Sequence, residues 1–144
     1  MNEQPRAAPN EKAIQHRVGE RWTPALVQGG WTPVSDFFLE WYRHLPLPLS
    51  NLEAMLVIHL IKHKWTRQAP WPSFKRLANR MGLTPTAVRN HARNLEKKGY
   101  LRRIERRGRA NQFDLTPLFS ALERLGPEQA RPERQKADAR PLPL

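Results

Sequence analysis

The chain has 144 residues and carries 25 Lys and Arg against 13 Asp and Glu, a formal net charge of +12 at pH 7. This length suits one domain with a modest core, and the absence of cysteine excludes disulfides, thiolate metal sites and thiol catalysis. No apolar run approaches the roughly 18 residues of a membrane span, and residues 1–24 lack the apolar centre of a signal peptide, so we expect a cytoplasmic protein that does not enter a membrane.

The two ends of the chain differ in composition from its middle. Residues 1–29 are charged and offer little apolar surface, which predicts a disordered or weakly docked N-terminal tail with Trp22 as a candidate anchor. Residues 127–144 are rich in Pro, Arg, Glu, Gln and Ala without periodicity, which predicts a disordered C-terminal tail. A single folded domain is therefore expected over residues 30–126.

The domain is expected to open with a helix over residues 36–44. Ser35 can cap its first turn. Its apolar face is bulky and consists of Phe37, Phe38, Trp41 and Leu45. The connector at residues 46–49 alternates proline with leucine and cannot continue the helix.

A longer helix is predicted from Ser50, which forms the capping-box pattern with Glu53, to about Lys64. Its main apolar face holds Leu52, Met55, Leu56 and Leu60. Further apolar residues fall on its other faces, so we expect it to be the buried central helix of the core. His59 and His63 stand at a spacing that can hold a metal, but no third ligand accompanies them, and neither a metal nor another cofactor is predicted.

Two short helices joined by a Gly-Leu-Thr turn come next. The first covers residues 73–81, with Ser73 as its cap. Its apolar face holds Phe74, Leu77 and Met81. Thr84 can cap the second helix, and Pro85 can take its first position, where a missing N–H costs nothing. Apolar residues then recur at helical spacing until Gly99 supplies a left-handed cap, which completes a helix-turn-helix pattern.

A short hairpin is predicted directly after this pair of helices. Residues 100–104 form its first strand, residues 107–109 a tight basic loop, and residues 112–115 the returning strand. Residues 69–71 can add a short strand beside it, and a last apolar helix is expected with Thr116 as its cap. The predicted fold is therefore mainly α with a small β-hairpin, a winged helix-turn-helix.

The second helix of the pair has a polar face opposite its apolar one. Arginine can bind guanine and asparagine can bind adenine through two hydrogen bonds each, so such a face suits the major groove of DNA. An ordinary solvated face is the alternative, but residues 72–111 hold 12 basic residues against 2 acidic ones, +10 of the net +12, which favours a phosphate backbone as partner. The predicted DNA-binding residues of this helix and the wing are Thr84, Thr86, Arg89, Asn90, Arg93, Asn94, Lys97, Arg107 and Arg109.

Residues 30–125 resemble the winged helix-turn-helix domain of plasmid and phage replication initiators, and related domains occur in many small bacterial regulators. In that family a Pro-Ser opens one helix, a Gly-Leu/Val-Ser/Thr turn precedes the recognition helix, and Leu-Glu-x-x-Gly-Tyr/Leu-Leu/Ile leads into the wing. The matching segments here are residues 72–73, 82–84 and 95–101, together with the lead-in at 31–34 and the helix start at 49–53. The family often has arginines where this chain has Pro85 and Thr86.

The resemblance implies double-stranded DNA binding, in transcription regulation or in the initiation of DNA replication. The alternative is a structural subunit that holds nucleic acid or another protein within a larger nucleoprotein assembly. Catalysis is not expected, because the acidic residues are scattered and no Gly-rich phosphate loop is present. No oligomeric state follows from the pattern.

Overall fold

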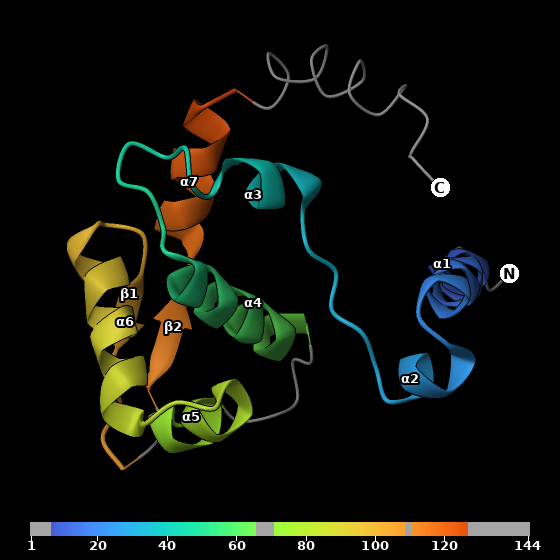
Figure 1. The fold of residues 1–144 in the computed structure, drawn as a ribbon, viewed down its shortest axis with the longest axis horizontal. Helices are drawn as coiled ribbons and strands as arrows, with labels where there is room; N and C mark the ends of the chain where they lie inside the picture. The colour runs from blue at the N-terminus through green and yellow to red at the C-terminus, as the bar shows by residue number, and fades with distance from the viewer. Residues whose placement is uncertain (1–6, 66–70, 109–110, 127–144) are drawn as a thin grey trace, which may run out of the picture. The chain divides into compact units, whose positions relative to one another are not determined.

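A computed structural model describes residues 7–65, 71–108 and 111–126. The chain divides between Pro33 and Val34 into two compact units, which are described separately. The first contains helices α1 (Ala7–Arg21) and α2 (Pro24–Gln28). The second contains α3 (Asp36–Trp41), α4 (Asn51–Trp65), α5 (Phe74–Met81), α6 (Pro85–Lys97), β1 (Arg102–Ile104), β2 (Gln112–Asp114) and α7 (Thr116–Arg124) (Figure 1).

The N-terminal unit has more regular structure than its composition predicted. The segment expected to be disordered or weakly docked forms α1 and α2 from Ala7 onward. The start of α2 has a local cause, because the Thr23 hydroxyl accepts a hydrogen bond from Leu26 N at 3.2 Å and Pro24 takes the first helical position. This cap is readable in the sequence and was missed. The boundaries predicted at residues 30 and 126 stay predictions, and residues 127–144 lie outside the described part.

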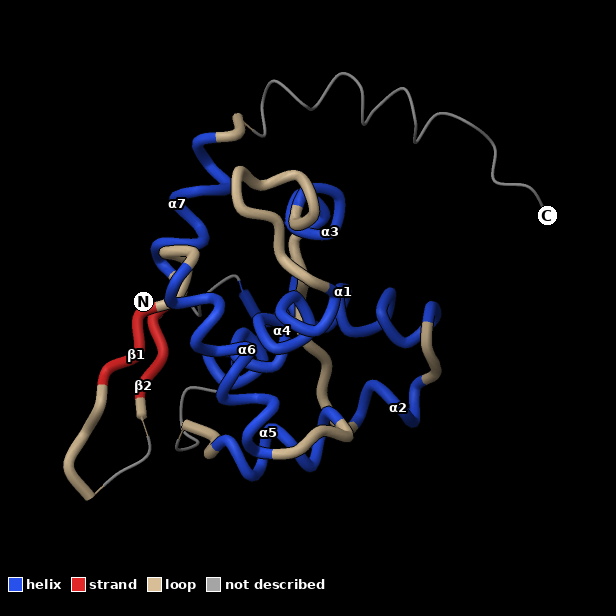
Figure 2. The backbone as a smooth tube through the Cα atoms, turned by 60° about the vertical axis from the view of Figure 1, so that its left-hand side comes forward, coloured by secondary structure: helices blue, strands red, loops and turns tan. Residues whose placement is uncertain are grey.

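The second unit is mainly α with a small antiparallel hairpin, as predicted. Figures 1 and 2 show α4 in the middle, with α5 towards one end and α3 and α7 towards the other. Helix α6 packs against both α4 and α5. In the hairpin, Arg102 is opposite Asp114, Arg103 opposite Phe113, and Ile104 opposite Gln112. The unit is thus a helix-turn-helix followed by a wing.

The predicted caps account for where most helices start. The hydroxyls of Ser35, Ser73 and Thr84 accept hydrogen bonds from the backbone N–H three residues later, at 3.4, 3.1 and 3.1 Å. Ser50 and Glu53 form the predicted capping box, with both reciprocal hydrogen bonds at 3.0 Å. These starts depend only on neighbours in the chain, which is why the pattern was sufficient to find them.

Several element ends differ from the prediction. The strands of the hairpin are shorter than predicted, at residues 102–104 and 112–114 instead of 100–104 and 112–115. Helix α3 stops at Trp41 rather than His44, because His44 N donates to Trp41 O in a tighter turn before the proline-rich connector. Thr116 is the first residue of α7 and not its cap; instead Asp114 Oδ1 accepts a hydrogen bond from Thr116 N at 2.9 Å. The strand predicted at residues 69–71 falls mostly outside the described residues.

One apolar core lies between the helices and the inner side of the hairpin. The side chains buried most completely are Leu49, Leu56, Val57, Leu60, Leu77, Val88, Leu95 and Leu118. Helix α4 is central, as predicted, but only half of its predicted apolar face is buried. Leu56 and Leu60 are buried together with Val57, whereas Leu52 and Met55 are 43% and 45% exposed, so the buried strip is turned around the helix away from these two residues.

Candidate nucleic-acid interface

Helix α6 is amphipathic, and the core holds its apolar side. Val88, Ala92 and Leu95 are buried. The polar face of α6, defined here as the exposed residues opposite that side, consists of Thr86, Asn90, Arg93, Asn94 and Lys97. These were predicted to bind DNA, and the structure brings them together on one exposed surface. Thr84 is also exposed, but its hydroxyl already accepts the hydrogen bond that caps the helix.

The carboxyl end of α6 is closed by the chain itself. Gly99 adopts a left-handed conformation with φ of 78°, as its predicted role as a cap requires. Gly99 N donates to Glu96 O and Tyr100 N donates to Leu95 O, each at 3.0 Å. This pair of hydrogen bonds is the Schellman motif, and it directs the chain from α6 into the wing.

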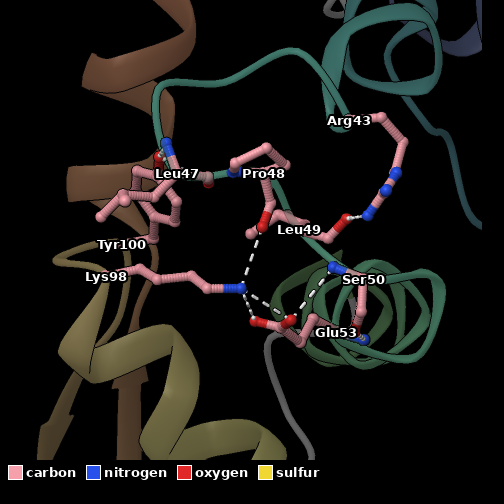
Figure 3. A network of polar contacts seen from close by, with 8 residues as sticks. All are labelled: Arg43, Leu47, Pro48, Leu49, Ser50, Glu53, Lys98 and Tyr100. Atoms are coloured by element: carbon pink, nitrogen blue, oxygen red, sulfur yellow. Dashed lines mark hydrogen bonds and ion pairs between the residues drawn. The ribbon is translucent and has the colours of Figure 1, made fainter.

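A buried ion pair joins this end of α6 to the start of α4 (Figure 3). The Glu53 side chain is almost fully buried, and Lys98 Nζ lies 2.8 Å from both of its carboxylate oxygens. Lys98 Nζ also donates to Pro48 O at 2.9 Å. Burial alone would raise the pKa of Glu53, but hydrogen bonds from Lys98 and Ser50 outweigh it and lower the pKa. Lys98 therefore orients α6 instead of adding to its exposed charge.

Tyr100 makes a second link between the α6 end and the connector before α4. Its hydroxyl donates to Leu47 O at 2.9 Å and accepts from Leu47 N at 3.1 Å (Figure 3). Within the same connector, Arg43 Nη1 donates to Leu49 O at 2.8 Å. The recognition helix is thus fixed to the core by polar contacts as well as by its apolar side.

The wing carries further positive charge. Arg107 is exposed beside Gly108, whose φ of 68° makes the tight turn predicted there. The Arg102 side chain is 70% exposed, and its Nη1 lies 4.0 Å from Asp114 Oδ2 across the hairpin. Arg109, the other predicted wing residue, lies outside the described residues. The hairpin that follows α6 therefore presents exposed guanidinium groups on the same unit as the polar face of α6.

Comparison with known proteins agrees with this geometry. Residues 48–101 match the model of a family described as a helix-turn-helix domain. That segment is a helix-turn-helix DNA-binding domain. The fold resembles the crystal structure of the N-terminal domain of DnaD protein from Geobacillus kaustophilus HTA426, with a TM-score of 0.57, 22% identity, and coverage of 77% of this chain and 93% of that one. At this identity the likeness supports the fold alone. No curated protein matches the chain.

Three exposed basic residues of the helix-turn-helix domain were missing from the predicted site. Lys75, Arg76 and Arg80 project from α5, the helix that precedes the turn. In helix-turn-helix complexes the first helix crosses the DNA backbone while the second enters the groove, so this is where phosphate contacts are expected. The charge count over residues 72–111 contains these three residues, whereas the predicted site held residues of the second helix and the wing only.

The two histidines of α4 lie at the edge of the core. The His63 ring is 4.0 Å from the Trp71 ring, measured between centroids. Burial is the main cause that lowers the pKa of both His59 and His63. The nearby positive charges of Arg80 and Lys62 lower both pKa values further. Among the described residues no group of three or more His, Asp and Glu side chains could hold a metal ion. No helix in this described part is long and apolar enough to cross a bilayer.

Proposed function

We propose that the protein binds double-stranded DNA sequence-specifically, with the polar face of α6 in the major groove and the basic wing on the sugar–phosphate backbone. The observation that carries this proposal is how the structure sorts the basic residues. Glu53 pairs with Lys98 and Glu96 with Arg103, while Arg93 and Lys97 are exposed on a face without an acid. Within the part of the chain that the structure describes, the positive charge that has no acidic partner is therefore concentrated on the exposed face of α6. The second helix of a helix-turn-helix contacts DNA with this face.

The biological role that fits best is that of a transcriptional regulator or a replication-initiation protein. Both roles require recognition of a particular duplex site, and both are supported by the resemblance of the motifs that flank the recognition helix. The exposed Arg93 and Asn90 supply base-reading chemistry, and Lys75 and Arg76 supply phosphate contacts from α5.

The decisive experiment is a selection of bound sequences from random duplex DNA with the full-length protein. A shared motif among the recovered duplexes, with affinity that falls steeply as salt rises, is the expected result. Recovery of duplexes without a shared motif would contradict sequence-specific binding, and a lack of duplex binding at low salt would contradict the proposal as a whole.

A role as a subunit of a larger nucleoprotein assembly is the second candidate, and the N-terminal unit supplies the observation that favours it. Trp22 and Leu26 are 70% and 62% exposed. Both line an apolar pocket of about 500 Å³ together with Val18 and Trp31. An exposed tryptophan beside an apolar pocket is typical of a protein-contact site. Co-purification of a stable complex, with no sequence preference by the isolated protein, would favour this role.

A further inference from the structure

The Phe74 ring, at the start of α5, has two guanidinium groups beside it. The Cζ atom of Arg89, in α6, lies 5.6 Å from the ring centroid, and that of Arg103, in β1, lies 5.9 Å from it. Both distances are within the roughly 6 Å over which an aromatic face attracts a cation. Phe74 therefore stands where the first helix of the pair, the recognition helix and the wing meet.

The two arginines differ in what else they contact. Arg103 Nε lies 3.3 Å from Glu96 Oε1, and only 18% of the Arg103 side chain is exposed. Arg89 is exposed, and no described carboxylate forms an ion pair with it. Arg103 thus ties β1 to α6, whereas Arg89 keeps an exposed positive charge over the ring.

The ring is itself held by other aromatic side chains. Phe74 meets Phe113 edge to face at 6.0 Å between centroids, and Phe113 meets Trp71 in the same way at 5.7 Å. Phe113 is buried in the core, and Phe74 is half-buried. A ring that is held by an aromatic neighbour in this way offers a fixed face to a nearby cation.

Arg89 occupies a particular place on α6. It precedes Glu96 by two turns, so both lie on the flank that faces α5 and β1, between the buried side and the polar face. An arginine in that place has many rotamers, and ordering them upon binding costs free energy. We propose that Phe74 is a positioning residue of the DNA interface, whose ring holds the Arg89 guanidinium ready at the wing-side edge of the recognition helix. This inference rests on the proposed function.

The test is a double-mutant cycle measured on the tightest duplex recovered from the random library. Phe74→Leu removes the aromatic face, and we expect it to weaken binding about threefold to tenfold, the range that a partly exposed cation–π contact implies. Phe74→Tyr keeps the ring and should bind within about twofold of wild type. In an Arg89→Ala background, Phe74→Leu should cost nothing more.

Other outcomes overturn the inference. Equal losses from Phe74→Leu with and without Arg89, or equal losses from the Leu and Tyr variants, would assign Phe74 a packing role alone. Phe37→Leu, an aromatic-to-leucine change in α3 where the ring stacks on Trp41, is the matched control for general destabilisation. If Phe74→Leu does not fold, Phe74→Met repeats the test with a flexible side chain that fills similar space.

A measurement on the free protein separates this inference from the proposed function. The ring should shift the Arg89 side-chain proton resonances upfield in the NMR spectrum, and the shift should persist in Phe74→Tyr and vanish in Phe74→Leu. Failure of the wild type to bind any duplex would contradict the proposed function. The NMR shift would still test the contact between Phe74 and Arg89 in that case. Absence of the upfield shift in the wild type would overturn the positioning role itself.

Discussion

At the scale of single residues, the basic side chains fall into two groups that composition alone does not separate. Lys98 and Arg103 each have a glutamate partner and are partly buried, with side chains 26% and 18% exposed. Arg93, Lys97 and Arg107 are exposed. A count of charges assigns all five to DNA, whereas the structure uses two of them to fix the recognition helix and the wing.

Arg93 lies on the polar face of α6, where base contacts are expected. Its replacement by alanine should cost about 1–3 kcal/mol of binding free energy at the preferred site and relax the choice of base there. Binding titrations on the selected duplex and on single-base variants measure both effects. Arg124→Ala, a change of an exposed arginine on α7, is the control. Uniform weakening on every duplex would reassign Arg93 to the phosphates.

The buried pair of Glu53 and Lys98 should make stability depend on pH. The folded-state pKa of Glu53 lies below its ordinary value, so its carboxylate contributes stability that is complete above that ordinary value. That contribution is lost as the pH falls through the folded-state pKa. Glu53→Gln should therefore lower the free energy of unfolding at neutral pH by about 1–3 kcal/mol, and by less in acid.

Urea unfolding at neutral and acidic pH measures this difference. Glu40→Gln, a change of an exposed glutamate on α3, is the matched control and should alter stability little at either pH. A loss from Glu53→Gln that is the same at both pH values would show that packing, and not the charge of the pair, is responsible.

At the scale of elements, the helices that begin with a local signal were predictable and the contacts that orient them were not. Ser50, Ser73 and Thr84 cap helices through neighbours three residues away, so the sequence pattern alone contains them. The hydrogen bonds of Tyr100 to Leu47 and of Lys98 to Pro48 join residues about fifty positions apart. Such pairs arise only when the fold brings them together, which periodicity cannot show.

The same distinction explains the error on α4. A helix with apolar residues nearly all round gives no preferred face. Its sequence pattern therefore does not show that Leu52 and Met55 are exposed. The wing is the opposite case. A glycine between basic residues, shortly after the strand predicted at residues 100–104, predicts a turn, and the structure has one at Gly108.

The wing should contribute affinity without sequence choice. Replacing both Arg107 and Arg109 by alanine should weaken binding to every duplex, because phosphate contacts release counterions from any sequence. The slope of log affinity against log salt should flatten by about 1–2 in magnitude, close to one per lost contact. Titrations at several salt concentrations measure it, and an unchanged slope would mean that the wing points away from DNA.

At the scale of the whole molecule, the charge and the apolar core belong to the same part of the chain. Residues 72–111 hold +10 of the net +12, and the buried apolar cluster runs from Phe37 to Leu122. The N-terminal unit is compact in its own right, with Val27 buried and Trp22 exposed. Folding and DNA binding should therefore both reside in the second unit.

A fragment of residues 30–126 tests this division. It keeps every segment of the core cluster and the basic segment, so it should melt within a few degrees of the full chain and bind the selected duplex with similar affinity. Thermal melts and duplex titrations of the fragment and the full chain provide the comparison, with Trp22→Ser in the full chain as a control that removes the candidate anchor alone. A clearly lower melting point for the fragment, reproduced by Trp22→Ser, would show that the N-terminal unit stabilises the domain. A loss of DNA affinity at an unchanged melting point would instead place part of the DNA contact in the removed ends.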